Sequence, residues 1–264
     1  MLKIKYTLLM TLLISAVAPA CYKYAYDHTQ VPWQPFSTGI LSDNIPVLCY
    51  HNISMTGGKE DVYHISALHF DEQIKILHDS GYHAILPDQL YDYLTQRQPL
   101  PSRPVMITFD DTHETHASIA APILEKYGFR GTFFIMTVCI GKKNYLTTQQ
   151  IRFLSRKGHV IGCHSYDHPA VTTSAGQQWK HQVDEPVKQL EAITGTTIRY
   201  YAYPFGVWNN TAITALKRLG IKAAFQLSEE TSSEEPLYTV RRMLVSGKWS
   251  QMDLLKRIKK QVRS

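Results

Sequence analysis

Short apolar runs alternate with amphipathic stretches along the chain from Ile45 onward. Seven of the apolar runs have the length and bounds of strands, and we expect strands over residues 47–50, 83–86, 105–109, 131–136, 159–163, 198–203 and 221–226. The stretches between them have helical periodicity near residues 67–80, 88–96, 114–127, 148–157, 177–193 and 210–219. Glycine stands at or just past the ends of five of these helices, where a left-handed residue is favoured.

A β–α unit repeated about seven times predicts an α/β fold in which helices cover a parallel sheet. The sheet is either open and doubly wound or closed into a barrel, and in both cases binding and catalysis take place at the carboxyl ends of the strands. No repeat, low-complexity tract or second-domain boundary interrupts the pattern. We therefore expect residues 45–264 to form one catalytic domain.

The first residues have a different pattern. Lysines precede an uncharged apolar run over residues 6–17, which is short for a membrane span, and Ala18-Pro19-Ala20 supplies small residues for a cleavage site. This predicts a signal peptide over residues 1–20 and an exported protein, in the periplasm, the cell envelope or the extracellular space. Cys21 follows directly, so lipidation of this cysteine and membrane attachment are the alternative to plain cleavage. The aperiodic residues 21–44 are typical of a linker.

Composition limits the classes of binding partner and indicates the state of the cysteines. The formal net charge is +6, but no run of Lys or Arg is long enough for a nucleic-acid groove, so no nucleic-acid partner is expected. The basic residues near 256–260 fit the solvated face of a terminal helix. Cys49, Cys139 and Cys163 sit in apolar runs without CxxC spacing, which favours buried free thiols over disulfides.

Two groups of candidate residues follow strands. Thr108-Phe109-Asp110-Asp111 ends one apolar run, and these carboxylates serve either catalysis or the acidic first turn of the next helix. His164 and His168, four residues apart after a later strand, can offer two imidazoles to one ion. One carboxylate and two histidines form a common catalytic ligand set that leaves a position open for water.

Two weaker candidates lie at other strand ends. Pro204-Phe205-Gly206 forms a stiff turn, whose backbone N–H groups either stabilise an oxyanion or belong to an ordinary connection. His51 ends the first strand and is either a proton donor or a surface histidine.

Taken in order, these motifs resemble the polysaccharide deacetylase family with the NodB homology domain, carbohydrate esterase family 4. The resemblance runs from about Ile45 to Val245 and rests on TFDD at 108–111, HSxxH at 164–168 and Pro-aromatic-Gly at 204–206. It implies a distorted (β/α)7-type barrel with the active site at the carboxyl ends of the parallel strands. The implied activity is metal-dependent removal of N-acetyl groups from an N-acetylglucosamine-containing polysaccharide at the cell envelope.

The resemblance also implies roles for single residues. Asp110 would be the general base, Asp111 with His164 and His168 would hold a divalent metal, and the Phe205 backbone N–H would help to bind the oxyanion. We expect Zn²⁺, with Co²⁺, Ni²⁺ and Fe²⁺ as alternatives that this ligand set does not exclude. The expected partner is an acetylated polysaccharide.

The chain departs from the common family pattern at several positions. It lacks the late Leu-x-x-His motif, and His51 at the end of the first strand resembles instead the circularly permuted poly-N-acetylglucosamine deacetylase branch, which implies that His51 is the general acid. Ala202 replaces a frequent arginine, while Arg199 and Arg242 are candidates for orienting the base. Thr112 stands where glycine is usual.

Alternative functions stay open at this stage. One is a non-catalytic saccharide-binding protein on the same fold, although a binder would not need a complete set of base, ligands and acid. The other is a deacetylase of peptidoglycan, chitin oligomers or acetylated xylan.

Overall fold

The computed structural model describes residues 45–55, 58–173, 178–227 and 230–262. The predicted signal peptide, the linker and Cys21 lie outside the described residues. Within those residues, no helix has the length and apolar character required to cross a membrane.

Parallel strands form the centre of the molecule, and their order in the sheet is β10-β9-β8-β7-β6-β5-β1-β11. Every pairing along this path is parallel. The strands are β1 (Val47–Tyr50), β5 (Pro104–Phe109), β6 (Thr132–Ile135), β7 (Val160–Cys163), β8 (Tyr200–Ala202), β9 (Ala223–Gln226), β10 (Val240–Arg241) and β11 (Met243–Leu244).

A single segment joins the two ends of this sheet. Only Arg242 separates β10, which pairs with β9, from β11, which pairs with β1. The segment therefore closes the sheet into a distorted (β/α)7-type barrel, which confirms the predicted fold class. The strands of the closing segment, β10 and β11, have two residues each and include or flank an arginine, so the apolar pattern does not reveal them.

The predicted strand over 83–86 has a smaller part in the fold than expected. It forms only β4 (His83–Ala84), which pairs with the start of β5 outside the main order of strands. The seventh place in the barrel belongs to the closing segment instead. A separate pair, β2 (Asn52–Ser54) and β3 (His64–Ser66), was also missed, because three-residue strands leave no readable alternation.

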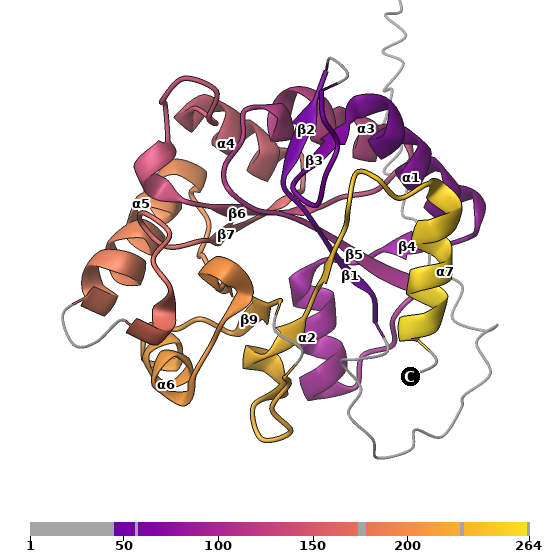
Figure 1. Ribbon diagram of the computed structural model, residues 1–264. Coiled ribbons are helices and arrows are strands. Elements are labelled where there is room, and N and C mark those ends of the chain that lie inside the picture. The colour runs from indigo at the N-terminus through magenta and orange to yellow at the C-terminus, as the bar shows by residue number, and fades with distance from the viewer. Residues whose placement is uncertain (1–44, 56–57, 174–177, 228–229, 263–264) are drawn as a thin grey trace, which may run out of the picture. The chain divides into compact units, whose positions relative to one another are not determined.

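Helices surround the strands, as Figure 1 shows for α1, α3, α4, α5 and α6. On α1, Phe70, Ile74 and Leu77 follow helical spacing and are fully buried, so this stripe faces the main hydrophobic cluster. The helices are α1 (Ala67–Asp79), α2 (Pro87–Gln96), α3 (Ala121–Lys126), α4 (Thr148–Arg156), α5 (Glu185–Thr194), α6 (Asn210–Arg218) and α7 (Gln251–Gln261). The predicted helix over 114–127 is divided, because a π-helical turn, η1 (His116–Ala120), precedes α3.

Alternate residues of the barrel strands form a second, inner hydrophobic cluster, to which α2 contributes Leu90. Phe134 on β6 and Phe225 on β9 meet there, with ring centroids 5.3 Å apart. Gly162 on β7 makes room for them, because a Cβ at this position would lie 2.5 Å from the Phe134 ring. Arg242 follows Val240 of this cluster by two residues and faces the same side, and its guanidinium lies 5.5 Å from the ring centroid of Phe134.

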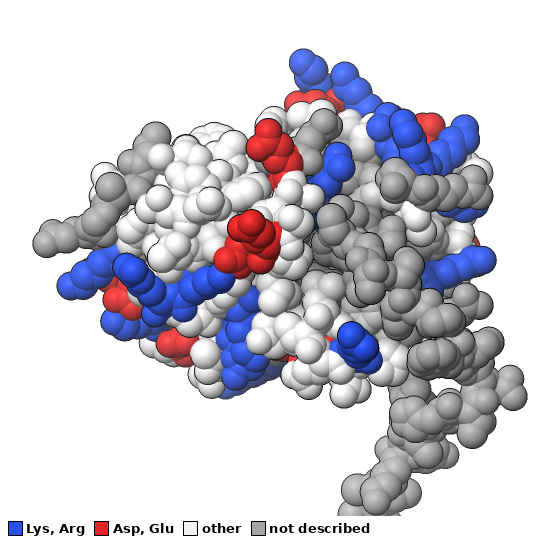
Figure 2. Space-filling model, turned by 90° about the horizontal axis from the view of Figure 1, so that it is seen from below, with Lys and Arg blue, Asp and Glu red and all other residues white. Residues whose placement is uncertain are grey.

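Surface charge is seen on one face of the molecule, and three cysteines lie among the described residues. On the face in Figure 2, basic and acidic side chains are interspersed with uncharged surface. Cys49, Cys139 and Cys163 are buried free thiols, as expected.

Candidate active site

The candidate site begins with a buried ion pair. Asp110 directly follows β5 and is 1% exposed, and Arg242 of the closing segment is 3% exposed. The guanidinium donates to both carboxylate oxygens of Asp110, at 2.8 Å and 2.7 Å. Burial raises the pKa of Asp110, but the Arg242 charge and hydrogen bonds outweigh burial and hold the pKa below its usual range. Asp110 is therefore ionised at neutral pH and fixed in orientation.

Asp111 lies beside the two predicted histidines. Its Oδ1 is 3.6 Å from Nε2 of His164 and 3.7 Å from Nε2 of His168. Burial raises the pKa of Asp111, but the hydrogen bond and charge of His164 outweigh burial and lower the pKa to about 2. The structure thus brings the predicted carboxylate and both imidazoles to one point.

The backbone after Asp110 takes an unusual path. Asp111 and Thr112 have φ values of 72° and 65°, in the left-handed region that favours glycine. This accounts for the glycine usual at position 112. Here the Thr112 hydroxyl accepts a 2.7 Å hydrogen bond from the N–H of Met136, which ties the turn to the end of β6.

His164 is held in one orientation by the backbone. Its Nδ1 lies 2.8 Å from the carbonyl oxygen of Ala202, so Nδ1 carries the proton and Nε2 is left facing Asp111. Burial lowers the pKa of His164, but Asp110 and Asp111 outweigh burial and raise it. Ala202 therefore contributes through its carbonyl group, at the position where the family that the motifs resemble often has arginine.

His168 and Phe205 form one wall of the site. His168 has a φ of 69°, and its N–H donates to the Ser165 hydroxyl at 2.9 Å. The exposed Phe205 ring meets the His168 ring edge to face, with centroids 4.6 Å apart. The turn holding Phe205 requires Gly206, whose φ is 69° and where a Cβ would lie 2.2 Å from Leu227.

His51 follows β1 and is 9% exposed, with Nδ1 buried and without a hydrogen-bond partner among the described residues. Burial lowers the pKa of His51, against the charges of Asp110 and Asp111. Its carbonyl oxygen lies 2.7 Å from Nε2 of His116. His116 is itself fully buried.

Arg199 lies apart from these residues. It precedes β8, at the amino end of the strand, and its half-exposed guanidinium is 3.9 Å from Asp88. Among the described contacts, only Arg242 of the two candidate arginines touches Asp110.

Cys49 is a residue of the site that sequence reasoning left as core. Its thiol is fully buried and lies 3.6 Å from Oδ2 of Asp110. The sequence did contain a signal for this placement. Cys49 lies on β1 two residues before His51, and alternate residues of an extended segment share a face.

The residues fit a divalent metal at the Asp111 cluster. The ligand atoms of Asp111, His164 and His168 lie within 4.8 Å of one another. Tetrahedral zinc with bonds of about 2.1 Å places its ligand atoms roughly 3.4 Å apart, close to the separations of 3.6 Å and 3.7 Å found here. Three protein ligands also leave one position open.

Fold and site define a class of protein: a parallel α/β barrel with an ionised carboxylate beside an Asp-His-His cluster at the carboxyl edge of its strands. A family model described as polysaccharide deacetylase matches residues 97–224. The chain is 28% identical to the Bacillus subtilis protein YxkH over 203 residues, 76% of this chain and 71% of YxkH.

Two further proteins are similar. The poly-β-1,6-N-acetyl-D-glucosamine N-deacetylase of Staphylococcus aureus is 27% identical over 201 residues, covering 70% of this chain and 68% of that protein. The solved structure of the Streptococcus pyogenes deacetylase PplD in complex with acetate superposes with a TM-score of 0.74 at 24% identity, over 81% of this chain and 97% of PplD. A polysaccharide deacetylase domain therefore covers residues 97–224 of the chain, and this domain and the similar proteins indicate a hydrolase of amide bonds.

Proposed function

We propose that this deacetylase hydrolyses N-acetyl groups of an N-acetylglucosamine-containing polysaccharide at the cell envelope, with a divalent metal held by Asp111, His164 and His168. The observation that carries the proposal is the meeting of three elements at one edge of the barrel. These elements are the ionised Asp110 fixed by Arg242, the metal-ligand cluster and the buried His51.

Asp110 is the general base of the proposed reaction. It removes a proton from the water that attacks the acetamide carbonyl. The two hydrogen bonds from Arg242 fix the carboxylate, so that the oxygen accepting the proton does not have to be reoriented in the transition state. Arg242 acts through Asp110 and is a positioning residue.

His51 is the general acid, which gives a proton to the departing amine. Burial lowers its pKa, which makes its imidazolium a stronger acid, and the Asp110 and Asp111 charges oppose this effect. The proton is carried in the low-pH form, so turnover should fall as the pH rises through the pKa of His51.

The developing oxyanion needs stabilisation from the other side. The bound metal supplies Lewis-acid polarisation of the carbonyl group. Phe205 lies in the turn after β8, where its ring contacts the ring of His168, and its backbone N–H is proposed as a hydrogen-bond donor to the oxyanion.

The substrate class is supported by the similarity to the Staphylococcus aureus enzyme, which is named for poly-β-1,6-N-acetyl-D-glucosamine. The test is acetate release by the full chain, loaded with Zn²⁺, Co²⁺ or Ni²⁺, from β-1,6-linked N-acetylglucosamine oligomers. Chitin oligomers, peptidoglycan and acetylated xylan serve as the comparison panel. No acetate from any of these substrates with any metal would overturn the enzymatic proposal, and saccharide binding without acetate release would favour the non-catalytic alternative.

Variants test the assigned roles separately. Asp110→Asn and His51→Ala should each lower kcat by about 10²–10⁴-fold while the metal content stays at that of the unmodified chain. His64→Ala is the matched control for His51, because His64 is an exposed histidine on β3. If His51→Ala turns over as fast as the control, His51 is not the general acid.

Export and the lipid anchor are part of the proposal and rest on the sequence of residues 1–21. The mature chain should begin at Cys21, and a lipid on this cysteine should retain it with the membrane fraction. Mass spectrometry of the mature amino terminus and fractionation of a Cys21→Ser chain test the two parts. A mature chain that retains residues 1–20 would exclude both.

A further inference from the structure

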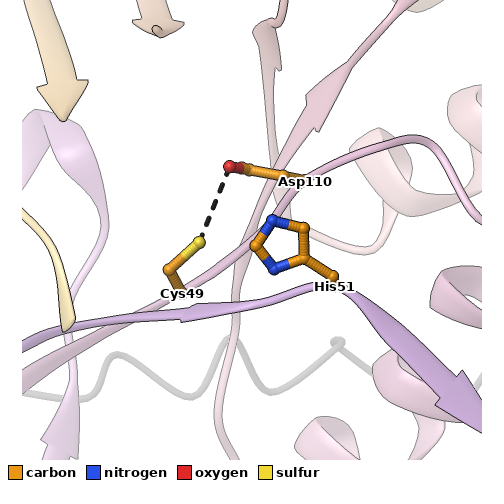
Figure 3. Close-up of side chains that lie close together, drawn as sticks. All are labelled: Cys49, His51 and Asp110. Carbon is orange, nitrogen blue, oxygen red and sulfur yellow. Dashed lines mark hydrogen bonds between the residues drawn. The ribbon is translucent and has the colours of Figure 1, made fainter. Parts of the chain in front are cut away.

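A second group of ligand-type side chains lies beside the proposed metal site. Cys49, His51 and Asp110 each offer one ligand atom, and these atoms lie within 4.8 Å of one another. Figure 3 shows the three side chains converging from the ends of β1 and β5, with the Cys49 thiol directed at the Asp110 carboxylate. The Asp111 cluster uses none of these three residues.

The separation of sulfur and oxygen suits a tetrahedral ion. With bonds of about 2.3 Å to sulfur and about 2.1 Å to oxygen, the 3.6 Å between Cys49 Sγ and Asp110 Oδ2 gives an angle of roughly 110° at the metal. The thiol proton now lies between these atoms, and an ion would take its place.

His51 supplies an independent indication of a ligand. Its Nδ1 is buried and has no hydrogen-bond partner among the described residues, although a buried imidazole nitrogen ordinarily has one. An ion at the Cys49–Asp110 pair would lie within reach of one nitrogen of the His51 ring. Thiolate, imidazole and carboxylate together form a donor set that borderline and soft divalent cations prefer.

We propose that Cys49, His51 and Asp110 form a second, inhibitory site for a thiophilic divalent cation such as Zn²⁺ or Cd²⁺. Binding replaces the proton of the Cys49 thiol, which leaves to solvent as the sulfur–metal bond forms. The cation then also binds Oδ2 of Asp110 and one ring nitrogen of His51, so that neither atom is available for catalysis. The inhibitory effect rests on the proposed base and acid roles of these two residues, whereas the binding itself does not.

The second site should be weaker than the first. Burial raises the pKa of Cys49, so the proton is displaced at a cost, and Arg242 places a positive charge next to the incoming cation. Inhibition should consequently begin only above one equivalent of metal per chain.

The experiment titrates the Zn²⁺-loaded full chain with further Zn²⁺ and, separately, with Cd²⁺. Bound metal, acetate release and the ultraviolet charge-transfer absorption of a Cd²⁺–thiolate bond are followed together. Exchange of Cd²⁺ into the Asp111 cluster gives no such absorption, because that cluster has no thiolate. Cys49→Ser keeps a small hydroxyl donor beside Asp110, and Cys49→Ala is the second variant in case serine disturbs folding.

Matched controls are Cys139→Ser, at the more exposed of the other two buried thiols, and Cys21→Ser. The expected result is a second bound equivalent, a thiolate absorption and inhibition in the unmodified chain and in both controls. In the Cys49 variants the absorption disappears, and the metal concentration for half-inhibition, relative to each variant's own activity, rises at least tenfold. Persistence of the absorption or unchanged inhibition in both Cys49 variants would overturn the second site. The two proposals can also fail separately. If the unmodified chain shows the thiolate absorption but releases no acetate, and the Cys49 variants lose the absorption, the second site stands and only the proposed function is contradicted.

Discussion

Replacing Arg242 by methionine tests the ion pair on which the site is built. Methionine keeps most of the volume of the side chain and removes the charge and both hydrogen bonds to Asp110. Both partners are almost fully buried, so the carboxylate would be left without compensation in a site that water barely reaches. Breaking such a pair costs about 3–5 kcal/mol in the free energy of unfolding. For a domain of this size, the loss corresponds to a fall of roughly 10 °C in Tm.

The cost should depend on pH with a definite sign. Arg242 holds the pKa of Asp110 below its ordinary value of 3.8, so the pair stabilises the fold above that pH and the contribution is lost as the pH falls through the folded pKa. In the methionine variant the largest interaction that lowers the pKa of Asp110 is gone. Burial then raises this pKa against only the charges of His164 and His51, so the folded chain is penalised above about pH 4. The stability deficit should therefore be largest near neutral pH and shrink towards pH 4. The acidic limb of kcat/KM should move to higher pH.

Denaturant unfolding of the metal-free chain between pH 4 and pH 8 measures this difference, with exposed Arg241→Met as the control. A double-mutant cycle with Asp110→Asn should give a coupling of about 2 kcal/mol or more, because the second substitution removes the charge left unpaired by the first. A deficit equal to that of the control, or one that is the same at pH 4 and pH 8, would refute the reasoning.

Three further outcomes are expected. Chelation should abolish acetate release until Zn²⁺ is restored, and Asp111→Asn should weaken metal binding measured by equilibrium dialysis; full activity in the chelated chain would exclude metal dependence. Gly162→Ala should lower stability by about 1–3 kcal/mol through collision with the Phe134 ring, and Phe134→Leu should recover part of the loss in thermal unfolding. Thr112→Gly should destabilise by roughly 1 kcal/mol, because losing the acceptor for the Met136 N–H outweighs the relief of a left-handed φ, whereas Thr112→Ser should be close to neutral. A Gly variant more stable than the Ser variant would reverse that balance.

Local pattern was sufficient for most of the barrel. The runs that became β1, β5, β6, β7 and β9 were recognisable because buried strands and amphipathic helices leave different periods in the sequence. Parallel strands also gather their carboxyl ends at one edge, so the strand pattern alone predicts that the residues after β5 and β7 lie close together.

The amino-acid pattern was therefore sufficient to predict the α/β fold class and to place Asp110, Asp111, His51, His164 and His168 at the active edge. How the barrel closes, and which arginine contacts Asp110, follows from the tertiary structure alone. The closing segment is a strand solely because β9 and β1 supply its hydrogen-bond partners, and two arginines hide it from any apolar period. Arg242 lies 132 residues from Asp110 along the chain, and neither this ion pair nor the approach of the Cys49 thiol leaves a local trace, because such contacts depend on how strands distant in sequence are placed side by side.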